Sequence, residues 1–312
     1  MIRIGDVHEA AQRISPHVRR TPLIETTCLS KALTPARLML KLENLQVSGS
    51  FKARGAMNKL LSLGPKAVSG GIVTASGGNH GLAVARAARH AGVSAKVFVP
   101  ENCTQEKLEK LRRWGAEVEV IGKIWNETNI AALAFADQTG AAYFHPFADA
   151  SVMAGQGTIA LEMLEASPDI NVMLVAIGGG GLISGMAVAL KALKPSMRII
   201  GIEPKGSPTL KACVEAGRVV RLPEVTSKVA TMSCAETDPS VYAVVREHVD
   251  EIMLVSDEEM EEAAHWLWFE LGVAADLSGA AAVAALRSGR LAFSGGDVVA
   301  GLVCGAGLDA LR

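Results

Sequence analysis

The chain has 312 residues and a formal net charge of −1, and 49% of its residues are hydrophobic although only 4% are aromatic. A chain of this size can bury a large core, and its length favours two domains over one. The nearly neutral charge gives no electrostatic footprint for nucleic acid or an anionic membrane, so we expect neither as a partner.

The N-terminal stretch "MIRIGDVHEAAQRI" places charges where a signal peptide needs an apolar segment, and no apolar run is long enough to span a bilayer.

The cysteines are odd in number and never spaced as C-x-x-C: Cys28, Cys103, Cys213, Cys234 and Cys304. This pattern argues against a disulfide framework or a zinc site and favours a reducing cytosol, so we expect a cytoplasmic protein. All but Cys304 are expected to be ordinary core or surface residues.

Apolar runs typical of strands alternate with amphipathic segments typical of helices along the chain. The expected strands cover residues 37–45, 70–76, 95–100, 117–122, 141–145, 172–177, 198–204, 251–256 and 297–304. The expected helices cover residues 51–63, 80–92, 104–115, 126–140, 151–167, 182–194 and 257–271. Gly92 is expected to close the second helix, and Ser256 with Glu259 forms a capping box at the start of the last one.

This alternation predicts an α/β fold with two open, twisted, mostly parallel sheets flanked by helices. The βα units between about Gly71 and His145 indicate a small domain. We therefore expect a small domain at 69–146, inserted into a large domain of residues 1–68 and 147–312. The glycines cluster at strand ends, where open α/β sheets bind their ligands.

The loop "ASGGNHG", residues 75–81, joins a buried strand to a helix. Backbone N–H groups at such a helix start favour an anion, and Ser76 and Asn79 add side-chain donors. The alternative is an ordinary βα turn in which Ser or Asn caps the helix.

The loop "IGGGGLISG", residues 177–185, holds four successive glycines. Their cost in backbone entropy makes a purely structural turn a poor explanation, whereas their N–H groups could surround a phosphate. The strand that follows ends near Glu203, so a dinucleotide site is the rival interpretation. That site would leave Lys52 and the Asn79 loop without a role. No Gly-Lys-Ser/Thr follows either glycine run, which excludes a Walker A loop.

The stretch "SGSFKARGA" places a single lysine, Lys52, at the boundary between an expected strand and an expected helix. The stretch "LVCGAGLD" places Cys304 at the end of the last expected strand. Pyridoxal phosphate needs a lysine amine, a phosphate cradle, a donor for its phenolic oxygen and a partner for its ring nitrogen. The chain resembles the pyridoxal-phosphate-dependent serine/threonine dehydratases, the threonine ammonia-lyase and serine racemase family of fold type II (tryptophan synthase β-like). The resemblance rests on "RTPL", "KLENLQVSGSFKARGA", "SGGNHG", "HPFADASVMAGQGTIALEML" and "VAIGGGGLISG".

The resemblance implies a role for each matching residue. Lys52 would bind the cofactor as an imine, with Phe51 packed against it and Asn79 on the phenolic oxygen. Gly178, Gly179, Gly180, Gly181 and Leu182 would hold the phosphate, and Cys304 would face the pyridine nitrogen. Ser76, Gly77, Asn79 and His80 would bind the substrate carboxylate. The family also implies a homodimer, and the chain ends without the regulatory domain of the biosynthetic threonine dehydratases.

The implied reaction is β-elimination from L-threonine or L-serine, giving a 2-oxo acid and ammonia. The freed Lys52 amine would remove the α-proton, and a neutral Cys304 thiol would favour elimination over transamination. Gly77 stands where serine racemase has a second acid/base, so racemisation is not expected. The alternative from a different class is a non-catalytic protein that binds the cofactor. The loop 75–81 argues against it, because cofactor binding alone does not need Ser76.

Three departures leave the substrate open. Residues 227–238, "SKVATMSCAETD", replace the Thr-Ile-Ala-Asp-Gly segment beside the substrate, and Asp276-Leu277 replaces a common Glu-Pro. Thr209 stands where cation-binding relatives have an acid, so a regulatory metal site is doubtful. A phenylserine or 3-hydroxyaspartate type of substrate is the alternative. The aromatic run His265–Leu271 is expected to be a packed helix face.

Overall fold

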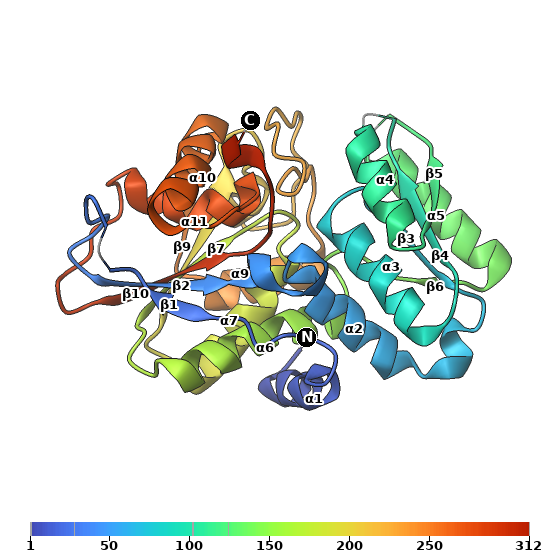
Figure 1. The fold of residues 1–312 in the computed structure, drawn as a ribbon, viewed down its shortest axis with the longest axis horizontal. Helices are drawn as coiled ribbons and strands as arrows, with labels where there is room; N and C mark the ends of the chain where they lie inside the picture. Colours follow the sequence, from blue (N-terminus) through green and yellow to red (C-terminus); the bar gives the residue numbers. More distant parts are fainter. Residues whose placement is uncertain (1, 28, 102, 124, 312) are drawn as a thin grey trace.

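The computed structural model describes residues 2–27, 29–101, 103–123 and 125–311, and its strands form two separate sheets (Figure 1). Cys28 lies outside the described residues. The prediction of an α/β fold with two mostly parallel sheets flanked by helices is confirmed.

The larger sheet has six strands in the order β1-β2-β10-β7-β8-β9. Their bounds are β1 Leu23–Glu25, β2 Arg37–Leu42, β7 Val172–Ala176, β8 Arg198–Pro204, β9 Glu251–Val255 and β10 Val298–Val303. Only β1 runs antiparallel to its neighbour. Every residue of the central strands β7 and β10 is buried, which explains their continuous apolar sequences.

Helices cover both faces of this sheet, with α10 and α11 on one side and α1, α6 and α7 on the other (Figure 1). The helices outside the smaller sheet are α1 Ile4–Ile14, α2 Lys52–Leu63, α6 Ala150–Ala166, α7 Gly181–Leu193, α8 Thr209–Ala216, α9 Pro239–His248, α10 Asp257–Leu271 and α11 Leu277–Arg287. Short 3₁₀ turns lie at η1 Glu43–Leu45, η2 Val47–Gly49, η3 Pro65–Val68 and η4 Asp309–Leu311.

The smaller sheet is parallel and has the order β5-β4-β3-β6. It consists of β3 Ile72–Ala75, β4 Ala95–Val99, β5 Glu117–Val120 and β6 Ala142–Tyr143, with helices α3 Asn79–Ala91, α4 Gln105–Arg113 and α5 Trp125–Thr139. The α3 and α4 side chains share one apolar cluster, and α5 packs in a second. We call this sheet with its helices the four-stranded unit.

The strand expected at 37–45 is too long by three residues. It ends at Leu42, and Glu43–Leu45 form a 3₁₀ turn instead. The turn brings the Glu43 carboxylate onto Arg54, with Arg54 Nε at 2.9 Å and Nη2 at 2.7 Å. An ion pair with α2 therefore outweighs the local strand pattern.

Both expected helix signals are present. Gly92 ends α3 in the left-handed region at φ 68°, and Ser256 and Glu259 form the capping box of α10. The expectation of a packed aromatic face is only half right, because Trp266 is buried whereas Trp268 and Phe269 are 44% and 80% exposed. Among the described residues, every helix is too short or too polar to cross a bilayer.

Candidate functional site

Lys52 is the first residue of α2, immediately after a turn held against the end of β10. Ser48 and Gly49 adopt positive φ values of 64° and 86°, which turn the chain into the helix. The Phe51 N–H donates to the Cys304 carbonyl at 3.1 Å. The Lys52 Nζ donates to the Pro146 carbonyl at 2.6 Å, and burial lowers the pKa of the amine to about 8. Lys52 therefore loses its proton at a lower pH than a free lysine does.

The opposite side of α2 is fixed by a buried ion network. Arg54 binds Glu43 and also Glu162, with Nη1 to Glu162 Oε1 at 2.6 Å, and Lys41 Nζ contacts Glu162 at 2.6 Å. Burial alone would lower the pKa of Arg54, but the two glutamates outweigh it and raise the pKa. This network fixes the N-terminal turn that carries Lys52.

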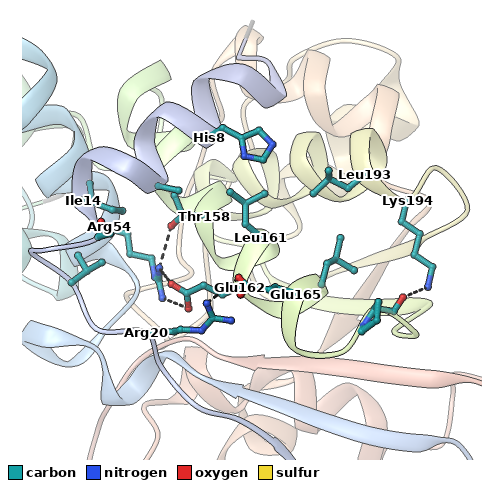
Figure 2. Close-up of a pocket in the computed structure, with 15 residues that line it drawn as sticks. His8, Ile14, Arg20, Arg54, Thr158, Leu161, Glu162, Glu165, Leu193 and Lys194 are labelled. Carbon is teal, nitrogen blue, oxygen red and sulfur yellow. Dashed lines mark hydrogen bonds and ion pairs between the residues drawn. The ribbon is translucent and has the colours of Figure 1, made fainter.

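A cavity of about 640 Å³ opens beside this network, between α1, α6 and the end of α7 (Figure 2). Figure 2 shows Arg54 and Glu162 on its wall, next to Arg20, which pairs with Glu165 at 2.9 Å. None of the site residues expected from the sequence lines this cavity. The cavity therefore lies away from the chemistry that the sequence predicts.

The glycine loop connects β7 to α7. Among the described residues, no protein atom accepts a hydrogen bond from the backbone N–H groups of residues 178–183. Gly180 has φ 92° and precedes the first turn of α7, where the helix dipole favours an anion. A phosphate is the acceptor that fits such a row of donors. Leu182 is buried in the large core beneath the loop.

Packing also requires these glycines. A Cβ at Gly179 would lie 2.2 Å from the Phe147 ring, and one at Gly181 would lie 2.6 Å from the Phe147 carbonyl oxygen. Phe147 directly follows Pro146, the partner of Lys52. The segment 146–147 therefore links the lysine to the glycine loop, although 94 positions separate Lys52 from Pro146 in sequence.

The loop 75–81 carries the second set of unpaired donors. Gly78, not Asn79 or Ser76, occupies the N-cap position of α3, so the alternative of a side-chain cap is wrong. Among the described residues, the N–H groups of Asn79 and His80 have no protein acceptor. Ser76 Oγ accepts only a long bond of 3.4 Å from the Gly78 N–H. This loop can therefore receive an anionic group such as a carboxylate.

Asn79 reaches across to the larger sheet. Its Nδ2 donates to Asp276 Oδ2 at 2.8 Å, and Asp276 Oδ1 accepts from Ser278 Oγ at 2.7 Å. The Cys304 thiol lies 3.6 Å from Ser278 Oγ. Burial raises the pKa of Cys304, with a further rise from Asp276, so the thiol is neutral at physiological pH. Asn79 and Cys304 are thus joined through Asp276 and Ser278.

Two histidines beside the lysine are held neutral. Burial, with a smaller contribution from the nearby Lys52, lowers the pKa of His80 to about 3 and that of His145 to about 4. His80 Nε2 lies 3.0 Å from the Phe144 carbonyl, and His145 Nδ1 accepts from the N–H groups of Phe147 and Ala148. These contacts give His145 a structural role.

The altered segment 227–238 lies between the two loops. A Cβ at Gly178 would lie 2.8 Å from the Thr231 carbonyl oxygen, and one at Gly78 would lie 3.6 Å from the Thr231 methyl group. Cys234 lies close enough to Lys52 to oppose, in part, the lowering of the Lys52 pKa by burial. These contacts place the segment beside both loops.

Glu203, the acid that the rival dinucleotide site would use, lies at the end of β8, a few residues before Thr209. Its two carboxylate oxygens accept from the N–H groups of Leu210 and Lys211 at 2.8 and 2.9 Å. Burial raises the pKa of Glu203 to about 7. In the part of the chain that the structure describes, no three His, Cys, Asp or Glu side chains gather as a metal site. Glu203 therefore caps α8 in this structure.

Sequence reasoning missed three partners of the site. Pro146, the carbonyl partner of Lys52, has no local signal. Phe147 lies within a motif that supported the resemblance, but its packing on the glycines was not foreseen. Asp276 was noted only as a departure, and its bond to Asn79 spans 197 positions.

Comparisons with known proteins agree with this geometry. The family model described as "Pyridoxal-phosphate dependent enzyme" matches residues 14–305. The chain is 39% identical to the catabolic L-threonine dehydratase TdcB of Staphylococcus aureus over 319 aligned positions, which cover 100% of this chain and 91% of that protein.

Two solved structures are similar over almost the whole chain. Maize serine racemase superposes with a TM-score of 0.93 at 34% identity, covering 98% of this chain and 93% of the racemase. The T.th. threonine deaminase superposes with a TM-score of 0.90 at 36% identity, covering 97% and 98%. With its lysine, its glycine loop and a family match that spans both sheets, this chain belongs to the pyridoxal-phosphate-dependent enzyme family.

Proposed function

We propose that this protein is an ammonia-lyase that converts L-threonine, and with it L-serine, to a 2-oxo acid and ammonia. The observation that carries the proposal is the position of Lys52 at the start of α2, with Nζ on the Pro146 carbonyl, in a chain similar along its whole length to a catabolic threonine dehydratase. A partly buried lysine with a pKa lowered to about 8 can both bind the cofactor and act as a base.

Pyridoxal phosphate supplies the electron sink for the carbanion when it is bound. Lys52 would hold the cofactor through Nζ and, once the substrate amine has displaced it, would take the α-proton at Nζ, while Phe51 would pack beside the cofactor. The N–H groups from Gly178 to Leu182 hold the phosphate. The loop with Ser76, Gly77 and His80 binds the substrate carboxylate. Asn79 donates to the phenolic oxygen.

Cys304 would face the ring nitrogen as a neutral thiol, because burial raises its pKa. A neutral thiol is a weak donor and does not force a positive charge on the ring. A ring without that charge would favour loss of the β-hydroxyl, so elimination is the expected reaction. Gly77 has no side chain that could return a proton from the opposite face, which argues against a racemase.

We propose residues 69–146 as the small domain and the remainder as the large one. We also propose a cytoplasmic homodimer. Exposed apolar side chains lie on the last turn of α10 and around η4, two elements that pack together: Trp268, Phe269, Leu308 and Leu311. A second copy of the chain would cover them. Sedimentation of the wild type and of Phe269→Glu tests this, with a monomeric wild type as the contrary result.

The activity test is 2-oxo acid and ammonia release from L- and D-threonine, L- and D-serine, phenylserine and 3-hydroxyaspartate, with Lys52→Ala as control. We expect turnover of L-threonine and L-serine that the control lacks. Turnover of only phenylserine or 3-hydroxyaspartate would replace the substrate assignment and point to the segment 227–238. Cofactor uptake with no turnover of any substrate would favour a non-catalytic binding protein, and absence of cofactor uptake would refute the proposal.

A further inference from the structure

One carboxylate lies between the two side chains expected at opposite ends of the cofactor ring. Asp276 is the N-cap of α11, and Asn79 is the first residue of α3 in the four-stranded unit. The Asn79 Nδ2 to Asp276 Oδ2 bond of 2.8 Å therefore joins this unit to the six-stranded part of the molecule.

The Asp276 carboxylate is held firmly in place. Its Oδ1 accepts from the Gly279 N–H at 2.6 Å and from Ser278 Oγ at 2.7 Å. Its own N–H donates to the Gly305 carbonyl at 3.0 Å, just beyond the end of β10. Oδ2 is thus aimed at Asn79 by bonds that are independent of Asn79.

Burial raises the pKa of Asp276, and the hydrogen bonds from Ser278, Asn79 and Gly279 oppose this by stabilising the ionised form. In that ionised form the carboxylate can only accept hydrogen bonds, and this fixes the orientation of the Asn79 amide. The NH₂ group must face Asp276, and its second hydrogen remains for another acceptor. If the partner could also donate, the amide could turn by 180° and exchange its donor for its acceptor.

The same carboxylate orients the thiol. Ser278 Oγ gives its hydrogen to Asp276, so it can only accept from the Cys304 thiol, whose sulfur lies 3.6 Å away. The direction of the thiol hydrogen is then set by Asp276 through one intervening hydroxyl.

The space around this contact is closed. A Cβ at Gly305 would lie 2.5 Å from Asp276 Oδ2 and 2.8 Å from Asn79 Nδ2. Gly305 does not adopt a positive φ, so the absence of a side chain there serves the close approach and not the backbone conformation. A methyl group at this point would separate the two partners.

We propose that Asp276 is a positioning residue that sets the hydrogen-bonding direction of both Asn79 and Cys304 toward the cofactor ring. The inference rests on the proposed function, since it takes these two side chains as the ring's partners. Asp276 itself touches neither substrate nor cofactor in this assignment, and it acts through the two groups that do.

The test compares Asp276→Asn, Asp276→Glu and Gly305→Ala with wild type. Asparagine keeps the N-cap of α11, because it accepts from Gly279 as aspartate does. Its NH₂ group then faces the NH₂ group of Asn79, which must turn. Glutamate keeps an acceptor-only group. Asp297→Asn is the matched control, since Asp297 accepts from Asn171 Nδ2 at 3.1 Å near the opposite end of β10.

Each apoprotein is titrated with pyridoxal phosphate, and the dissociation constant and the visible absorption spectrum of the bound cofactor are recorded. For Asp276→Asn we expect about tenfold weaker binding and a changed ratio of the visible bands. Gly305→Ala should show the same spectral change, Asp276→Glu should restore the wild-type spectrum, and Asp297→Asn should match wild type. Urea unfolding of the apoproteins should not separate Asp276→Asn from Asp297→Asn, which excludes a merely structural effect.

Wild-type affinity and spectrum in both Asp276→Asn and Gly305→Ala would overturn the inference and leave the proposed function standing. A spectral change that Asp276→Glu fails to reverse would also overturn it, because the acceptor-only character would not be the cause. A wild-type protein that takes up no pyridoxal phosphate would overturn the proposed function first. Should Asp276→Asn fail to fold, Gly305→Ala carries the test alone.

Discussion

Replacing Arg54 by methionine should destabilise the protein strongly, because it leaves a buried carboxylate without its counter-ion. Arg54 and Glu43 are both fully buried, at 0% exposure. The guanidinium binds Glu43 through Nε at 2.9 Å and Nη2 at 2.7 Å, and it binds Glu162 through Nη1 at 2.6 Å. Methionine fills similar space but offers no donor.

The two glutamates differ in what remains to them after the change. Glu162 keeps Lys41 Nζ at 2.6 Å, whereas among the described residues Glu43 keeps one side-chain hydrogen bond, from the hydroxyl of Thr21, and interacts with Lys41 only through its charge. Removing one partner of a buried ion pair costs roughly 3–5 kcal/mol, a large part of the roughly 5–15 kcal/mol that stabilises a typical protein. The expected loss for Arg54→Met is therefore about 3–5 kcal/mol, nearly all of it from Glu43.

Urea unfolding at pH 7, followed by circular dichroism, measures this loss. Arg198→Met is the control, because Arg198 pairs with Glu251 at 2.8 Å on the surface and should cost below about 1 kcal/mol. Adding Glu43→Gln to Arg54→Met should recover stability, since no charge is then left unpaired. A loss for Arg54→Met no larger than that of the control, or no recovery in the double variant, would refute the reasoning.

Three further predictions concern the site itself. Because burial lowers the pKa of Lys52 to about 8, the rate at which the apoprotein takes up pyridoxal phosphate should rise with pH through about 8, in stopped-flow absorbance; a midpoint near the ~10.4 of a free lysine would contradict this. Gly179→Ala should weaken cofactor binding at least about tenfold in equilibrium titration, because the added methyl group would lie 2.2 Å from the Phe147 ring. Gly77→Ser should lower kcat/KM for L-threonine, because its Cβ would lie 2.8 Å from the Cys103 sulfur, and Cys103→Ala in the same chain should recover part of the loss.

Matched controls separate these effects from general damage. Gly5→Ala adds a methyl group in α1 where no atom lies within 4 Å, so it should leave cofactor binding unchanged. Cys103→Ala alone should leave kcat/KM close to wild type. If the double variant is no better than Gly77→Ser alone, contact with Cys103 is not the cause of the loss.

The local features of this fold could be predicted from the sequence. Alternating strands and helices, the end of α3 at Gly92 and the capping box at Ser256 depend on residues a few positions apart. Such short-range hydrogen bonds and burial patterns leave a signal in the order of residues. The glycine loop and Lys52 could likewise be recognised, since each lies at a boundary between a strand or turn and a helix.

The tertiary structure alone decided which of these local features meet. Lys52 reaches Pro146 across 94 positions, and Asn79 reaches Asp276 across 197. The larger sheet also inserts β10 between β2 and β7, and the end of β10 contacts the turn before Lys52. The turn of Glu43 onto Arg54 and the exposure of Phe269 also contradict their local patterns. A local pattern shows how polar a segment is. The order of strands and the charged side chains on other elements determine what that segment contacts.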